Sequence, residues 1–177
     1  VEVVDVQRVS VPMRAAVEDA VTLRDLGMTA KEIRERMDQE KENSVVFIAV
    51  DNLDRLKKGG RITPIAAAIG NVLKIRPILK YHGESLDAFA KVRSAKKAKQ
   101  TIIQALEKQM AEWDLHTPSK IRVQAACTFG YEGKEEWIND LQAAFPEFDI
   151  EYGDLPMNLS CHIGTGGVGA ALTKKLD

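Results

Sequence analysis

The run Val45-Val-Phe-Ile-Ala-Val50 constrains the fold more than any other segment, because six consecutive apolar residues rich in β-branched side chains are typical of a strand covered on both faces. Such a strand requires packed elements on each side of its sheet. Helical patterns lie on either side of it, the longest capped by Ser94 and ending near Trp113. This alternation predicts an α/β fold in which helices are layered on a sheet.

Hydrophobic period and turn residues place the remaining elements. A hairpin formed by 76–81 and 85–93 argues against an entirely parallel sheet, so we expect a mixed one. Thr29 and Glu32 have the spacing of a capping box. Further strands are predicted at 1–6, 121–128, 148–152 and 158–163, and helices between Pro12 and Gly27 and at 29–42, 51–58, 63–73, 132–145 and from about 167 onward.

Composition excludes several classes of protein. Of the 177 residues, 45% are hydrophobic and 29% charged, which is typical of a globular chain and argues against disorder. The longest apolar run near the amino end has six residues, whereas a membrane span needs about 20. An acidic start argues against a secretory signal. Cys127 and Cys161 lack metal-site spacing and disulfides are unnecessary at this size, so we expect a reducing, cytoplasmic setting and no metal.

Charge is unevenly distributed along the chain. Residues 55–99 contain twelve Lys or Arg and two acidic residues, a net charge of +10, while the rest carries −11. Such a block attracts nucleic acid, phosphate, a membrane surface or an acidic protein face, although a solvated helical face is the favoured explanation of the pattern alone. Because interleaved aromatic residues and nucleic-acid-binding motifs are missing, we expect no nucleic acid partner.

The segment Gly164-Thr-Gly-Gly-Val-Gly169 satisfies GxGxxG, but only eight residues follow it, too few for a dinucleotide-binding βαβ unit. Its backbone could still bind an anion, and a purely structural turn is an equal alternative. His162 precedes this loop at the end of a predicted strand, where its ring could donate to a carboxyl group. Two arginines are candidates for binding a phosphate or carboxylate: Arg61, which follows two glycines, and Arg93, which lies near Lys91 in the sequence.

Several ordered motifs closely resemble those of the DegV family of fatty-acid-binding proteins. The resemblance covers essentially the whole chain. It rests on Val50-Asp-Asn-Leu-Asp-Arg-Leu-Lys-Lys-Gly-Gly-Arg-Ile62, Gly70-Asn-Val-Leu-Lys-Ile-Arg-Pro-Ile-Leu79, Gly83, Lys91-Val-Arg93 and His162-Ile-Gly-Thr-Gly166. The resemblance implies a DegV-like mixed sheet layered with helices and a non-enzymatic protein without a cofactor. It also implies that a long-chain fatty acid is held and its carboxylate presented to the catalytic protein of a fatty acid kinase, which forms an acyl phosphate.

The same resemblance assigns roles to individual residues. His162 matches a histidine that holds the carboxyl group, and Arg61 and Arg93 match arginines that engage the kinase. The expected ligand-binding set is His162, Ile163, Gly164, Thr165, Gly166, Ile65, Ile69 and Ile78, with the helix over 63–73 and the strand over 76–81 lining or supporting an acyl tunnel. Transient contact with a membrane surface is compatible with the basic stretch.

Family members are typically about a hundred residues longer at the amino end. The resemblance therefore implies that 1–43 is the tail of an N-terminal α/β domain and that 44–177 is the C-terminal lipid-binding domain. Thr165 and Gly167 replace a more usual Pro and Ala, and Arg76 replaces a common Lys. Two alternatives stay open: a phosphate- or nucleotide-binding enzyme that uses the glycine loop, and a structural or regulatory fragment without a ligand.

Overall fold

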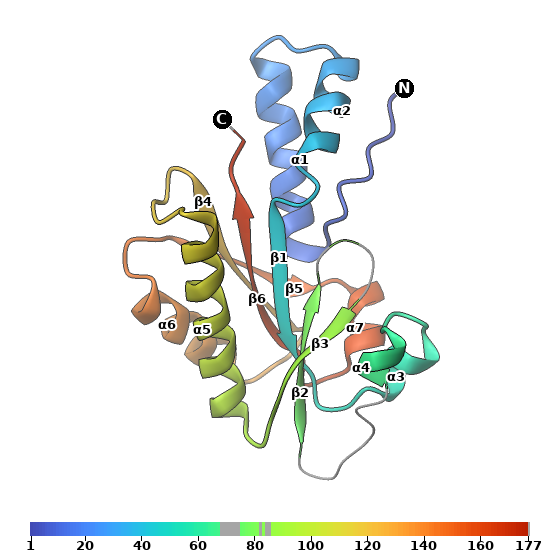
Figure 1. Cartoon of the computed structure of the whole chain (residues 1–177), viewed down its shortest axis with the longest axis vertical. Coiled ribbons are helices and arrows are strands. Elements are labelled where there is room, and N and C mark those ends of the chain that lie inside the picture. The colour runs from blue at the N-terminus through green and yellow to red at the C-terminus, as the bar shows by residue number, and fades with distance from the viewer. Residues whose placement is uncertain (68–74, 82, 84–85, 177) are drawn as a thin grey trace.

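A computed structural model describes residues 1–67, 75–81, 83 and 86–176. Its six-stranded mixed sheet, in the order β3-β2-β1-β6-β4-β5, is layered with helices, which confirms the predicted fold class (Figure 1). The strands are β1 (Ser44–Ala49), β2 (Arg76–Tyr81), β3 (Leu86–Val92), β4 (Ile121–Thr128), β5 (Ile150–Leu155) and β6 (Val168–Lys174). β4 and β5 pair in parallel, joined through a helix, and the other neighbouring strands pair antiparallel.

Seven helices are described: α1 (Ser10–Asp25), α2 (Ala30–Gln39), α3 (Asp54–Lys58), α4 (Pro64–Ala67), α5 (Ala95–Trp113), α6 (Lys134–Ala144) and α7 (Met157–Ile163). Two predicted caps are confirmed. The Thr29 hydroxyl accepts from the Glu32 amide while the Glu32 carboxylate accepts from the Thr29 amide at 2.7 Å, and Ser94 accepts from the Lys97 amide at 3.1 Å. Within the described ranges, none of the helices combines the length and apolar composition that crossing a membrane requires.

One face of the sheet is covered by α5 and α6, which lie side by side in Figure 1. The alternating residues of β1 decide which side chains enter this layer: Val45 and Phe47 point into it with the fully buried Trp137 of α6. The Trp137 indole Nε1 donates to the Gly169 carbonyl oxygen at 3.0 Å and ties α6 to the centre of the sheet. This layer is therefore a closely packed hydrophobic core.

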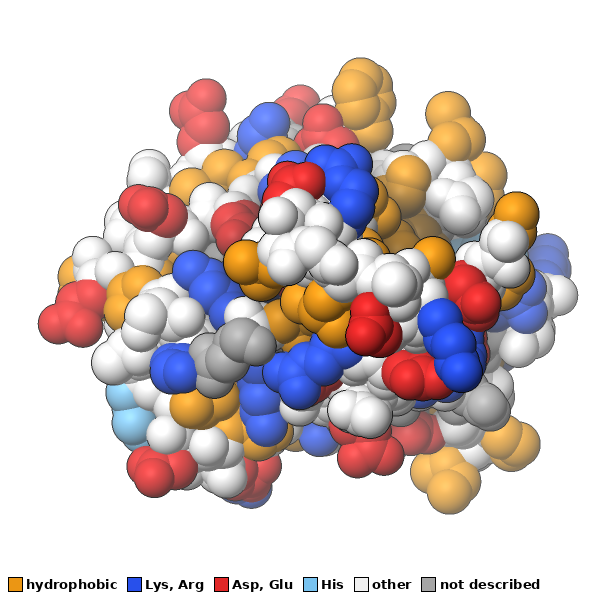
Figure 2. All heavy atoms as spheres, turned by 90° about the horizontal axis from the view of Figure 1, so that it is seen from above, with side chains coloured by type: hydrophobic (Ala, Val, Ile, Leu, Met, Phe, Trp, Pro, Cys, Tyr) orange, Lys and Arg blue, Asp and Glu red, His pale blue; other side chains and the backbone are white. Residues whose placement is uncertain are grey.

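The opposite face carries α1, α3 and α7 and a second apolar cluster that includes Ile48, Leu56, Leu79 and Leu155. α1 packs against β4, β5 and β6, and α2 returns alongside α1. Seen from the α1–α2 end, acidic and basic side chains are interspersed around hydrophobic ones (Figure 2). The two faces thus differ in their cover, because α5 and α6 pack on one face while α1, α3 and α7 share the other.

Three of the predicted elements are wrong. Residues 1–6 form no strand, because Val1 and Val3 are exposed and no neighbouring strand pairs with this segment. Residues 158–163 belong to helix α7, in which Leu159 and Ile163, four residues apart, point to the same side. The predicted terminal helix is instead strand β6, whose continuous burial between β1 and β4 overrides the helix propensity of its alanines.

The helix predicted over 63–73 is described as α4 up to Ala67, with Ala66 fully buried, and its remainder, including Ile69, lies outside the described residues. The hairpin over 76–93 is confirmed by the pairing of β2 with β3. Two of the three predicted turn residues, at 82 and 84, also fall outside the described ranges.

Candidate functional site

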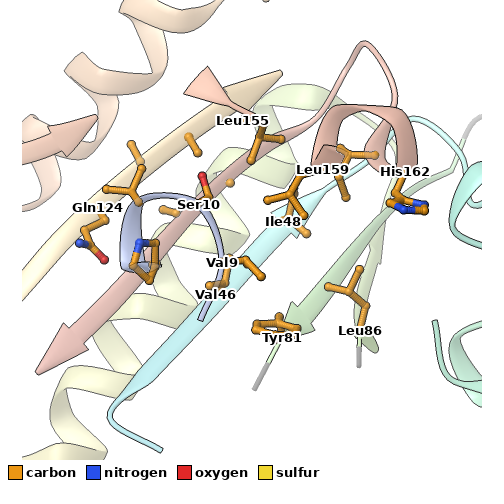
Figure 3. Close-up of a pocket in the computed structure, with 18 of the residues that line it drawn as sticks. Val9, Ser10, Val46, Ile48, Tyr81, Leu86, Gln124, Leu155, Leu159 and His162 are labelled. Carbon is orange, nitrogen blue, oxygen red and sulfur yellow. The ribbon is translucent and has the colours of Figure 1, made fainter. Parts of the chain in front are cut away.

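An apolar cavity of about 240 Å³ lies on the face of the sheet that carries α1, α3 and α7. Its walls come from the start of α1, from helices α3 and α7, and from residues of all six strands. Among the side chains that line it are Val9, Val46, Ile48, Tyr81, Leu86, Leu155, Leu159 and Ile163. Figure 3 shows His162 at one end of this row of side chains and Gln124 at the other. The cavity therefore has hydrocarbon walls and an ionisable imidazole at one end.

His162 lies in the last turn of α7, and not at the end of a strand as predicted from the sequence. Its side chain is half-buried. The ring has no hydrogen-bond partner among the described residues, so both nitrogens keep their capacity to donate or accept. This is the residue in the cavity wall best suited to orient a carboxylate.

Arg61, a candidate from the sequence for binding an anion that the family resemblance assigned to a partner, also lines the cavity. Its backbone is fixed on both sides: its amide donates to the Leu56 carbonyl at 3.1 Å, and its carbonyl accepts from the Leu86 amide at 3.4 Å. The exposed side chain pairs with no acidic group in the described parts of the chain. Arg61 and His162 thus place two potential cations in the wall of one cavity.

Arg93 lies elsewhere. It is exposed at the junction between β3 and α5 and does not line the cavity. Lys91, Lys96 and Lys97 around it are also exposed, so the basic character predicted for this stretch is displayed on the surface.

The glycine loop after α7 is held by Thr128. The Thr128 hydroxyl donates to the Gly164 carbonyl at 2.6 Å and accepts from the Gly167 amide at 3.2 Å. Gly164 has φ +89° and ψ −173°, a conformation open to glycine alone. The hydroxyl closes the loop, so Thr128 is a structural residue that sequence patterns did not single out.

The surroundings of this loop disfavour a phosphate. The loop follows the carboxyl end of α7, where a helix dipole is negative, and the predicted helix after it is a strand. The Asp51 carboxylate packs so closely on the α-carbon of Gly166 that a methyl group there would overlap it. Asp51 is itself paired with Arg76. The anion-binding argument for the loop therefore loses its physical basis.

The remaining predicted ligand-binding residues are placed as follows. Ile163 lines the cavity, whereas Gly164, Thr165 and Gly166 follow it in the loop outside the wall. Ile65 is 80% exposed and does not line the cavity. Ile78 does not line it either, because it is buried on the opposite face of the sheet with Phe47. From the strand over 76–81, Tyr81 at its end lines the cavity.

Most of the cavity residues that sequence reasoning missed come from the start of α1 and from strands β1, β4 and β6, and α7 adds Leu159. The spacing of Leu159 and Ile163 was a usable signal for α7. Val9 and Val11 gave no sequence signal for a cavity, since apolar residues at the start of a helix are expected in a packed core as often as in a cavity wall. No group of three side chains suited to a metal occurs in the ranges that the structure describes.

Comparison with known proteins is consistent with this arrangement. The family model described as "uncharacterised protein, DegV family" matches residues 1–175. The chain belongs to the DegV family. A fatty acid-binding protein of Thermotoga maritima is 31% identical over 162 residues, which cover 90% of this chain and 54% of that protein. A DegV domain-containing protein of Streptococcus pyogenes is 28% identical over 169 residues, 94% of this chain and 57% of that one.

Solved DegV structures share the fold. The crystal structure of a fatty acid binding DegV family protein from Streptococcus agalactiae has a TM-score of 0.83 and 26% identity, covering 99% of this chain and 60% of that one. The structure of a stearic acid-binding protein from Eubacterium ventriosum has a TM-score of 0.85 and 20% identity, and the match covers 97% of this chain and 58% of that one. The chain thus spans somewhat more than half the length of these DegV relatives.

Proposed function

We propose that this DegV chain is a fatty-acid carrier whose cavity holds an acyl chain and whose His162 orients the carboxylate. The observation that carries the proposal is a cavity with hydrocarbon walls and, at one end, an imidazole that has no hydrogen-bond partner within the described ranges. Relatives described as fatty-acid-binding support it.

The energetics favour a ligand of this kind. Each buried methylene contributes about 0.8 kcal/mol, so ten of them supply about 8 kcal/mol before ordering costs, and few polar anchors are needed. The cavity is slightly smaller than the range of about 300–1,000 Å³ that is usual for ligand pockets. We therefore expect the described walls to enclose part of a long acyl chain.

We also propose that the carrier presents the carboxylate to a kinase and is not itself an enzyme. Arg61, at the cavity, and Arg93, on the surface, would face this partner, and the resemblance of their motifs to those of the family supports the assignment. Cytoplasmic residence would follow from such a partnership. We further propose that residues 1–43 are the tail of an N-terminal domain and that the C-terminal lipid-binding domain begins at residue 44.

Native mass spectrometry of the purified protein tests the binding function. A co-purified fatty acid supports the proposal, a co-purified nucleotide supports an enzyme that uses the glycine loop, and an empty protein that also fails to take up added fatty acid contradicts it. His162→Ala should weaken fatty-acid affinity about tenfold or more, as expected for losing one charge-assisted hydrogen bond. The matched control is His116→Ala, an exposed histidine away from the cavity.

Kinase turnover of the bound fatty acid tests the partner. Arg61→Ala should spare fatty-acid retention and reduce turnover, whereas Arg24→Ala, on the exposed side of α1, should change neither. Equal loss of retention in Arg61→Ala and His162→Ala would show that Arg61 serves the ligand and would contradict its assignment to the kinase.

A further inference from the structure

Gly59 and Gly60, which precede Arg61, have different backbone requirements. Gly60 has φ +62°, in the left-handed region that favours glycine. Gly59, at the end of α3, has φ −81° and ψ −5°, which any residue adopts. The backbone therefore does not explain a glycine at position 59.

The space above Gly59 is occupied by the imidazole of His162. A methyl group on the Gly59 α-carbon would lie 2.5 Å from Nδ1 and 2.7 Å from Cε1 of that ring, well inside contact distance. α3 packs against α7 and brings these two residues together. The ring has no hydrogen-bond partner in the described parts of the chain, and it packs on the bare α-carbon of Gly59.

We infer that Gly59 is a positioning residue for the fatty-acid site: the missing side chain lets the His162 ring lie against α3 with its Nδ1–Cε1 edge, so that Nε2 is the nitrogen left for a carboxylate. This inference rests on the proposed function. It assigns to the first glycine of the Gly-Gly-Arg segment a specific steric role.

A cycle of four proteins tests the inference: wild type, Gly59→Ala, His162→Ala and the double variant. Gly59→Ala should weaken fatty-acid affinity about tenfold, as far as His162→Ala does, because a displaced ring cannot make its hydrogen bond. In the His162→Ala background the added methyl group meets no ring, so Gly59→Ala should leave the residual affinity unchanged. Wild-type affinity in Gly59→Ala, or a further tenfold loss in the double variant, would overturn the inference.

Two readouts do not depend on fatty-acid binding. The imidazole NMR resonances of His162 in the ligand-free protein should shift in Gly59→Ala, while those of His116 stay in place. Melting temperature should rise by a few degrees when Gly59→Ala is added to the His162→Ala variant, because alanine reduces the freedom of the unfolded chain, and should not rise when it is added to the wild type. Unmoved His162 resonances would refute the positioning role even if the protein binds fatty acid, whereas a shift without any fatty-acid binding would refute the proposed function alone.

Discussion

At the scale of single residues, the environment of Cys127 illustrates how the sheet controls chemistry. The side chain is fully buried next to Tyr152, and burial raises the pKa of its thiol from 9.0 to about 11. Cys161 is exposed. The two cysteines, indistinguishable in a composition count, therefore differ in burial, and burial makes the Cys127 thiol hard to ionise.

This difference predicts how stability depends on pH. Above about pH 9 the unfolded chain releases the Cys127 proton while the folded protein keeps it, so the free energy of unfolding should fall as pH rises from 9 to 11. Urea denaturation at several pH values measures the fall, which should be smaller in Cys127→Ala. The rest of the fall comes from groups such as Tyr152, because burial also raises the pKa of Tyr152. Cys161→Ala, which removes an exposed thiol, is the matched control, and equal profiles in both variants would contradict the assignment.

At the scale of elements, sequence signals predicted helix caps well, because the hydrogen-bond partners lie a few positions apart in the sequence. The caps at Thr29 and Ser94 involve residues three positions away, and both are present. β6 and α7 were predicted with the wrong type, because the burial of Val168–Lys174 between two strands distant in sequence is decided by tertiary packing. The same limit applies to the site: His162 was identifiable, but Val9 and Leu159 reach the cavity only through the packing of α1 and α7 on the sheet.

The capping box of α2 gives a prediction about an element. Thr29→Ala removes the hydroxyl that accepts from the Glu32 amide and should lower the free energy of unfolding by about 1 kcal/mol. The hydrogen bonds to Thr29 also lower the pKa of Glu32, so this stabilisation is present above the ordinary pKa of a glutamate and is lost as pH falls through the lowered value. Urea titrations should show a smaller difference in the free energy of unfolding between the variant and the wild type at pH 3 than at pH 7. Thr22→Ala, within α1, is a threonine control without a cap.

At the scale of the whole molecule, the asymmetry between the two faces of the sheet is testable by enlarging alanines. Ala126 lines the cavity and Ala49 is buried in the opposite, filled layer. Ala126→Leu should occupy cavity space and reduce retention of long acyl chains without lowering the melting temperature. Ala49→Leu should overpack and cost about 1–3 kcal/mol of stability. Binding assays with fatty acids of increasing length and thermal melts measure both effects, and equal destabilisation by the two variants would show that the cavity face is as full as the other.

The position of β6 in the sheet has a consequence for biosynthesis. β6 follows every other strand in the sequence, yet it lies between β1 and β4 and hydrogen-bonds to both. The hairpin side, β3-β2-β1, and the β4-β5 side can therefore be joined only after the ribosome has synthesised β6. Until then β1 and β4 expose unpaired edges, the kind of surface that chaperones shield in a nascent chain.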